Sequence, residues 1–250
     1  MSVKVSNLGL PLHSDIDIIF SDVHDGSMAA GGGAPSASTH MKNADRFLSR
    51  HGFSNKRSRV LVQYTPERTY TDVRQLSDET IGQEIACDAL YTTEPGRVIT
   101  LPVADCVATV VYDPVTGMLG VLHLGRHSSV AGLIEAFIIE VADSLGSDPR
   151  DWLVWMSPSL KMVHDRLEFF EPIDSDEWSD FARRGKDGIY IDMVGHNQAR
   201  FIRAGVELSN IVSSKSDTYS DDNYFSHRAY LDSRSDKNGR MMVAAKIIND

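Results

Sequence analysis

Short runs of apolar residues separated by turn residues predict several β-strands along the chain. The single strands expected are residues 16–20, 59–63, 152–156, 211–213 and 241–247. Two longer apolar stretches, 98–111 and 118–124, flank the sequence Asp-Pro-Val-Thr-Gly at 113–117. Proline and glycine in such a segment favour a tight turn. The sequence therefore predicts a β-hairpin at the centre of the chain.

Helical spacing is clearest just after this hairpin. The apolar residues there recur every three or four positions: Val130, Leu133, Ile134, Phe137, Val141 and Leu145. We expect this helix to start at Ser128 or Ser129 and to end before Gly146. Further helices are expected at 43–52, 176–184 and 192–204, and a flexible Gly/Ala/Ser loop near 26–40.

Strands and helices do not alternate regularly, which favours an α+β fold over a doubly wound parallel sheet. We expect a single domain over residues 1–250, with mixed β-sheets flanked by helices. Asp and Glu outnumber Lys and Arg by 35 to 25, giving a formal charge of −10 that argues against a nucleic-acid partner. No uncharged apolar run approaches the ~20 residues of a membrane helix. The N-terminal segment shows no signal-peptide pattern, so we expect a cytoplasmic location.

Cys106 and His123 are the main candidates for chemistry. They lie where the two hairpin strands would meet, in P-V-A-D-C-V and G-V-L-H-L-G. A thiolate and an imidazole are ligands that Zn²⁺ prefers, and the same two groups could instead form a nucleophile–base pair. A buried structural pair is the third interpretation, because cysteine is often buried. Asp105 could orient such a pair, although alternation along a strand would turn it to the opposite face.

Several segments resemble motifs of the laccase-domain family, which is also called the peptidoglycan editing factor or purine nucleoside phosphorylase family. Ala104-Asp105-Cys106 resembles its A-D-C, and His123-Leu124-Gly125 the start of its H-A-G-W-R-G. Other matching segments follow in the family's order: Phe20 to Ser27, Asp45-Arg46, Val62-Gln63, Asp88 to Thr92, Phe225-Ser226-His227-Arg228 and Gly239-Arg240-Met241.

The resemblance implies one metal, usually Zn²⁺, held by His, Cys and His, with Cys106 and His123 as two of the ligands. It also implies purine nucleoside and phosphate as substrates, for phosphorolysis or for deamination of adenosine. The expected phosphate ligands are arginines, whose planar guanidinium suits phosphate: Arg46, Arg126, Arg228 and Arg240. Copper fits less well, because a multi-copper oxidase needs several copper sites that this sequence does not offer.

The sequence departs from the family pattern at the first metal ligand. Tyr64 stands near the position of the missing histidine. Four histidines are possible substitutes, of which the first two lie inside family-like motifs: His24, His227, His127 and His164. Glycines of the family are also replaced, as in Ser157 to Met162. Three hypotheses stay open: a metal-dependent nucleoside enzyme, a metal-free Cys–His hydrolase, and a binding protein whose catalytic site has decayed.

Overall fold

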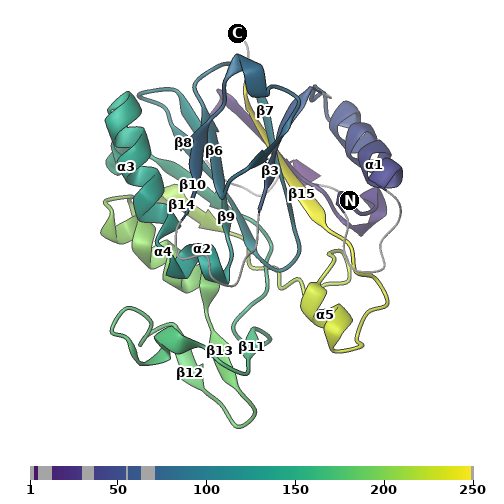
Figure 1. Cartoon of the computed structure of the whole chain (residues 1–250), viewed down its shortest axis with the longest axis vertical. Coiled ribbons are helices and arrows are strands. Elements are labelled where there is room, and N and C mark those ends of the chain that lie inside the picture. The colour runs from purple at the N-terminus through teal and green to yellow at the C-terminus, as the bar shows by residue number, and fades with distance from the viewer. Residues whose placement is uncertain (1–2, 5–12, 30–36, 55, 63–70, 249–250) are drawn as a thin grey trace.

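The structure is a computed structural model that describes residues 3–4, 13–29, 37–54, 56–62 and 71–248. Two β-sheets pack face to face at its centre (Figure 1). The first has the strand order β1-β2-β15-β7-β3-β5. Its strands are β1 (Val3–Lys4), β2 (Ile16–Phe20), β15 (Met241–Ile247), β7 (Val98–Val103), β3 (Arg57–Leu61) and β5 (Glu84–Ala86).

The second sheet has the strand order β14-β10-β8-β9-β6-β4. Its strands are β14 (Ile211–Ser213), β10 (Leu153–Met156), β8 (Val107–Asp113), β9 (Met118–Leu124), β6 (Ala89–Thr92) and β4 (Val73–Gln75). Strands β8 and β9 form the predicted hairpin, with Asp113 opposite Met118 beside the turn and Ala108 opposite His123 near the other end. Asp113 closes the turn, since its carboxylate accepts hydrogen bonds from the N–H groups of Val115 and Thr116.

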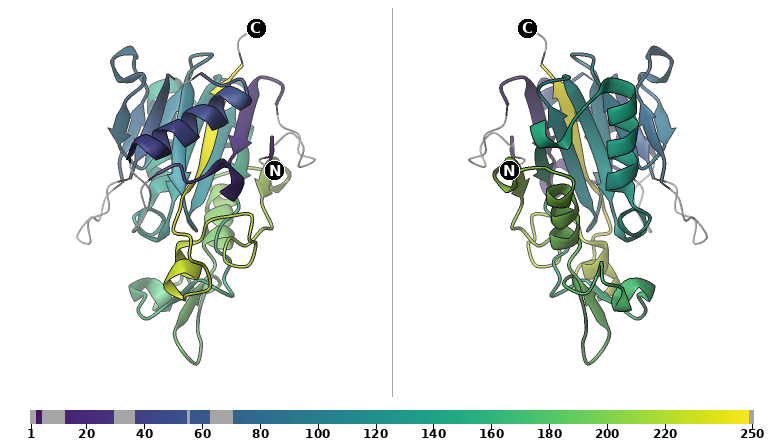
Figure 2. Two further views of the ribbon diagram at one scale, coloured as in Figure 1. Left: turned by 90° about the vertical axis from the view of Figure 1, so that its right-hand side faces the viewer. Right: turned by 90° about the vertical axis from the view of Figure 1, so that its left-hand side faces the viewer.

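Helices cover the outer faces of both sheets (Figure 2). Helix α1 (Ala37–Arg50) packs on the first sheet, and helices α3 (Leu133–Leu145) and α4 (Met193–Arg203) pack on the second. Because both faces of each sheet are covered, β15 is continuously apolar from Met241 to Ala245 rather than alternating with polar residues. Val243 contributes to the core between the sheets, and its neighbour Met242 packs on the side of α1.

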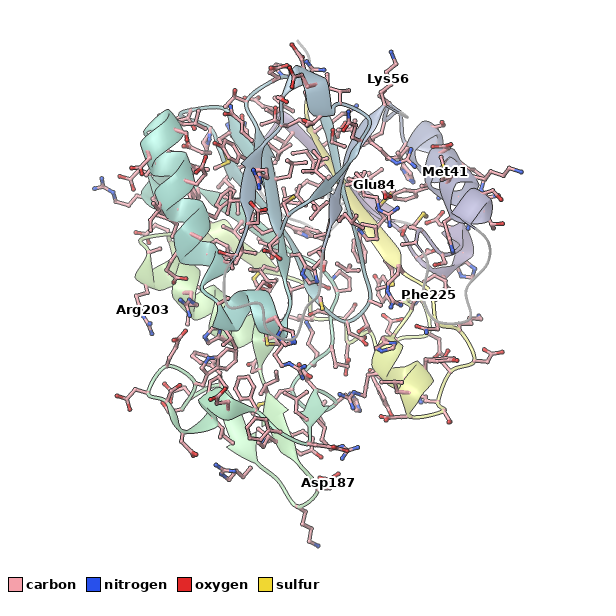
Figure 3. All side chains as sticks on the ribbon, in the orientation of Figure 1. Met41, Lys56, Glu84, Asp187, Arg203 and Phe225 are labelled. Carbon is pink, nitrogen blue, oxygen red and sulfur yellow. The ribbon has the colours of Figure 1, made fainter. Side chains whose placement is uncertain are left out.

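A small third sheet projects from one end of the molecule. It has the order β11-β13-β12, from strands β11 (Arg166–Leu167), β13 (Ile189–Ile191) and β12 (Ala182–Arg184). Asp187 lies in the turn at the tip of this projection (Figure 3). Two short helices, α2 (Arg126–Val130) and α5 (His227–Leu231), lie at the same end of the sheets (Figure 1). Of the described helices, none is long and apolar enough to cross a membrane.

The α+β architecture and helix α4 confirm the sequence predictions. The central hairpin is confirmed for 107–113 and 118–124, whereas residues 98–103 of the expected first arm form β7 in the other sheet. The helix expected at 176–184 is wrong: this segment is a turn around the buried Trp178, followed by β12. The helix expected to begin at Ser128 or Ser129 is two helices, because Gly132 adopts a left-handed φ of 80° between them.

The segment near 26–40 is not a loop throughout. Met28 and Ala29 are buried, and α1 already begins at Ala37 instead of at 43. The N–H of Met28 donates to the carbonyl of Arg240, the residue just before β15. This hydrogen bond holds Met28 beside the start of that strand. Residues 30–36 of the expected loop lie outside the described residues.

Candidate functional site

Cys106 and His123 meet at the end of the hairpin opposite its turn. His123 is paired across the two strands with Ala108. Cys106 directly precedes β8. Its Sγ and the His123 ring lie close together, since both would contact a Cβ at Gly125. Two hydrogen bonds fix the His123 backbone: its N–H donates to the carbonyl of Asp88, and its carbonyl accepts from the hydroxyl of Ser128 at 2.6 Å.

The absence of a side chain at Gly125 makes room for this pair. A Cβ at Gly125 would lie 3.1 Å from Cys106 Sγ, 2.8 Å from His123 Cε1 and 3.3 Å from His123 Nε2. The thiol and the imidazole thus face the same small space. Nδ1 of His123 is buried and has no hydrogen-bond partner among the described residues. The ring nitrogen that lies beside the space at Gly125 is the other one, Nε2.

Both side chains are neutral at pH 7 in the absence of a metal. Burial raises the pKa of the Cys106 thiol to about 12, and the charges of Asp105 and Asp165 add to this rise. Burial lowers the pKa of the His123 imidazole to about 4. A thiolate–imidazolium pair needs the opposite shifts. The electrostatics therefore disfavour the metal-free Cys–His hydrolase.

A cavity of about 460 Å³ opens beside this pair. Cys106, His123 and Gly125 form one part of its wall. Its apolar lining comes from Val62, Ala104, Leu160, Leu167 and Leu231. Its other polar lining comes from Asp88, Asp105, Arg126, His127, Ser128, Asp165, His227 and Arg228. An apolar space with a few convergent polar groups is typical of a small-molecule site.

Asp105 connects the Cys106 loop to helix α5. Its carboxylate accepts hydrogen bonds from the hydroxyl of Thr218 and from the backbone N–H of Arg228, each at 2.7 Å. The expectation that Asp105 is a strand neighbour of Cys106 that points to the opposite face is wrong, because Asp105 is not in a strand. Asp105 has a left-handed φ of 75° and lies before β8 begins, so alternation does not apply to it.

Three of the four predicted arginines are near Cys106. Arg126 and Arg228 line the cavity, and the positive charges of Arg240 and Arg126 lower the pKa of Cys106 against the effect of burial. The fourth, Arg46, is directed elsewhere: it donates hydrogen bonds to the carbonyl of Asp25 and to the side chain of Asn43. It is not among the described residues that line the cavity.

Of the four histidines that could replace the missing metal ligand, two line the cavity and two lie elsewhere. His127 and His227 line the cavity. His24 is exposed in a short 3₁₀ turn, where its N–H donates to Asp22. His164 forms a 2.5 Å hydrogen bond with Asp217 and stacks on Tyr219. The cavity's lining, as far as the structure describes it, includes neither His24 nor His164.

Sulfur and imidazole nitrogen are a donor pair that suits Zn²⁺, and His123 carries an unpartnered buried nitrogen. Cys106 and His123 would hold the ion. The part of the chain that the structure describes contains no group of three or more His, Cys, Asp or Glu residues arranged to bind a metal. The position expected to supply a further ligand, Tyr64, lies outside the described residues.

Sequence reasoning missed Asp165. This carboxyl group is 9% exposed and lines the cavity. Burial raises its pKa to about 7, which the charge of Arg228 partly offsets. Asp165 lies between the 3₁₀-like turn after Lys161 and strand β11, in an irregular segment where no spacing pattern identifies a site residue.

A family model described as multi-copper polyphenol oxidoreductase laccase matches residues 34–248. The chain is 30% identical to a purine nucleoside phosphorylase of Staphylococcus saprophyticus over 73% of this chain and 67% of that protein. It is 28% identical to the purine nucleoside phosphorylase YlmD of Bacillus subtilis over 63% of this chain and 57% of that protein.

Solved structures show the same fold. YlmD from Geobacillus stearothermophilus superposes with a TM-score of 0.80 at 19% identity, covering 96% of this chain and 95% of that one. The hypothetical protein YfiH of Bacillus licheniformis superposes with a TM-score of 0.77 at 19% identity, covering 93% and 92%. The likeness therefore extends over nearly the whole chain.

Proposed function

The chain belongs to the laccase-domain family described by the multi-copper polyphenol oxidoreductase laccase model, and on this premise we propose that it is a Zn²⁺-dependent purine nucleoside phosphorylase. The observation that carries the proposal is the convergence of Cys106 and His123 around Gly125 at the wall of a cavity that also holds Arg126 and Arg228. The names of relatives from Staphylococcus and Bacillus support the same reaction.

The cavity's chemistry suits a nucleoside with phosphate. Its apolar lining, including Leu160 and Leu167, would bury a purine base. Arg126 and Arg228 present guanidinium groups, which bind phosphate oxygens in a fork. A bound Zn²⁺ would act as a Lewis acid in this cavity. Cys106 would hold Zn²⁺ as a thiolate and would lose its proton on binding, so a protonated Cys106 is compatible with a metal site.

The experiment pairs a metal assay with turnover. Zinc content is measured in protein purified without chelator, and adenosine plus phosphate is assayed for adenine and ribose 1-phosphate. Cys106→Ala and His123→Ala are expected to lose zinc and turnover together. Cys87→Ala is the matched control, because Cys87 is buried in the core between the sheets and does not line the cavity.

Zinc content, alkylation of Cys106 and nucleoside turnover together decide between the three hypotheses. A zinc content near zero that does not rise on reconstitution would reject the metal-dependent enzyme. Rapid alkylation of metal-free Cys106 that His123→Ala abolishes would support a Cys–His hydrolase. Bound zinc without turnover of any purine nucleoside would favour a binding protein. We also expect Tyr64→His to raise zinc affinity, since imidazole is a better zinc ligand than a neutral phenol.

A further inference from the structure

Asp165 is a buried carboxyl group of the cavity that is neither a candidate metal ligand nor a candidate phosphate ligand. It is 9% exposed and lines the cavity with Cys106 and His123. Among the described residues its carboxylate forms neither a hydrogen bond nor an ion pair within 4.0 Å, although its backbone N–H donates to the carbonyl of Lys161 and its carbonyl accepts from the N–H of Ile191. A buried polar group without a partner is costly. A ligand in the cavity would supply that partner.

We propose that Asp165 is the general acid of the reaction, which binds the purine base at N7 and gives its proton to this atom as the base leaves. The inference rests on the proposed phosphorolysis, and it adds to that proposal the group that activates the leaving base. The apolar part of the lining of the same cavity, which includes Leu160, Leu167 and Leu231, is suited to the faces of a base.

Burial and the charged groups around Asp165 together bring its pKa close to neutral pH. Burial is the largest influence and raises its pKa to about 7. The carboxylates of Asp105, before β8, and Asp192, before α4, add to this rise. The guanidinium groups of Arg228 on α5 and Arg126 on α2 oppose it. A general acid works best when its pKa lies near the working pH.

Phosphorolysis would transfer the carboxyl proton of Asp165 to the leaving base. A phosphate oxygen attacks C1′ of the ribose and forms a C–O bond, while the C1′–N9 bond breaks and its electron pair passes into the imidazole ring of the base. The carboxyl proton of Asp165 moves to N7, so the base leaves neutral and Asp165 becomes a carboxylate. A proton from water restores the acid after release of the base.

The carboxylic acid also matches one edge of adenine. Its O–H donates to N7, and its carbonyl oxygen accepts from the 6-amino group, since that edge of adenine presents an acceptor beside a donor. The side-chain amide of asparagine offers the same donor and acceptor in the same places. It cannot give up a proton to a leaving group. Asp165→Asn therefore separates binding of the base from acid catalysis.

The test compares two substrates in wild-type protein and in Asp165→Asn. Adenosine needs a proton on its leaving base, whereas 4-nitrophenyl ribofuranoside releases a phenolate that needs none. For adenosine we expect kcat to fall at least about 100-fold in Asp165→Asn while KM changes less than about threefold. For the nitrophenyl substrate we expect kcat within about threefold of wild type. Asp187→Asn, at the tip of the projection, is the matched control and should behave as wild type on both substrates.

The pH profile gives a second measurement. In wild-type protein kcat/KM for adenosine should fall as pH rises above about 7, because Asp165 loses its proton. In Asp165→Asn this decrease of kcat/KM at high pH should be absent. An unchanged kcat for adenosine, an equal loss on both substrates, or an unchanged pH profile would overturn the inference.

Failure of the proposed function is recognised separately. If wild-type protein turns over no purine nucleoside, phosphorolysis is wrong, and the role of Asp165 is tested by calorimetric binding of adenosine at pH 6 and pH 8. Base recognition by Asp165 then requires tighter binding at pH 6 that Asp165→Leu removes. Equal binding at both pH values, or no binding, would reject it.

Discussion

The carboxylate of Asp105 accepts a hydrogen bond from the backbone N–H of Arg228 at 2.7 Å, and this contact joins residues 123 positions apart in the sequence. A second 2.7 Å hydrogen bond from the hydroxyl of Thr218 reaches the other oxygen of the same carboxylate. One side chain thus fixes the start of α5, with its cavity residues His227 and Arg228, against the loop that carries Cys106. The position of Arg228 in the cavity depends on this link.

We expect Asp105→Ala to lower the free energy of unfolding by about 2–4 kcal/mol, because it removes two hydrogen bonds to a charged acceptor and leaves alanine at a left-handed φ. Asp105→Asn should cost less, since asparagine tolerates this backbone conformation and keeps one oxygen acceptor. Urea unfolding measures both variants. An unchanged free energy of unfolding in Asp105→Ala would mean that the carboxylate does not stabilise this link to α5.

The arginines give a prediction about phosphate. Arg126→Gln should raise KM for phosphate about tenfold, since a charge-assisted hydrogen bond in a cavity is replaced by a neutral one. Arg46→Gln is the matched control. Arg46 contacts Asp25 and Asn43 rather than the cavity lining, so its KM for phosphate should stay at the wild-type value. Initial rates at varied phosphate measure both. A comparable rise in the two variants would point to a general loss of positive charge rather than to direct binding.

The hairpin made Cys106 and His123 predictable from the sequence. The turn and the regular ladder place His123 opposite Ala108, and Cys106 directly precedes the first strand of this hairpin, so the two residues meet without long-range information. The same reasoning failed at Asp105, because a left-handed φ interrupts alternation and is not encoded in the apolar pattern. It failed at Asp165 because an irregular segment brings that residue to the cavity from a distant part of the chain.

The wrong helix at 176–184 has a related cause. This segment contains apolar residues at helical spacing, among them Trp178 and Phe181. In the structure, Trp178 stacks on the imidazole of His196 from helix α4 at a centroid distance of 3.6 Å, and Phe181 contacts the same ring edge-on. Tertiary packing of these aromatic groups replaces the local helix, and single-sequence propensity is a weak guide in such cases.

The buried imidazole of His196 should make the protein less stable in acid. Burial lowers its pKa to about 4, whereas an unfolded histidine titrates near 6.5. Between these values the unfolded chain binds more protons than the folded one, so the free energy of unfolding decreases as pH falls from about 6.5 towards 4. His196→Phe keeps a ring on Trp178 but does not titrate. We expect it to remove on the order of 1 kcal/mol of the decrease between pH 7 and pH 5 in urea unfolding. An unchanged decrease would contradict the lowered pKa of His196.

Gly125 provides the sharpest test of the candidate metal centre. Its φ of −99° is accessible to any residue, so Gly125→Ala adds a methyl group without backbone strain. That methyl group would lie 2.8 Å from His123 and 3.1 Å from Cys106, and we expect at least about a tenfold loss of zinc affinity in a competition assay with a chelator. Gly120→Ala, in the same strand β9, is the control. Its Cβ would meet Phe137 in the core, so it should lower stability and leave zinc affinity unchanged. Unchanged affinity in Gly125→Ala would show that Cys106 and His123 do not bind the metal together.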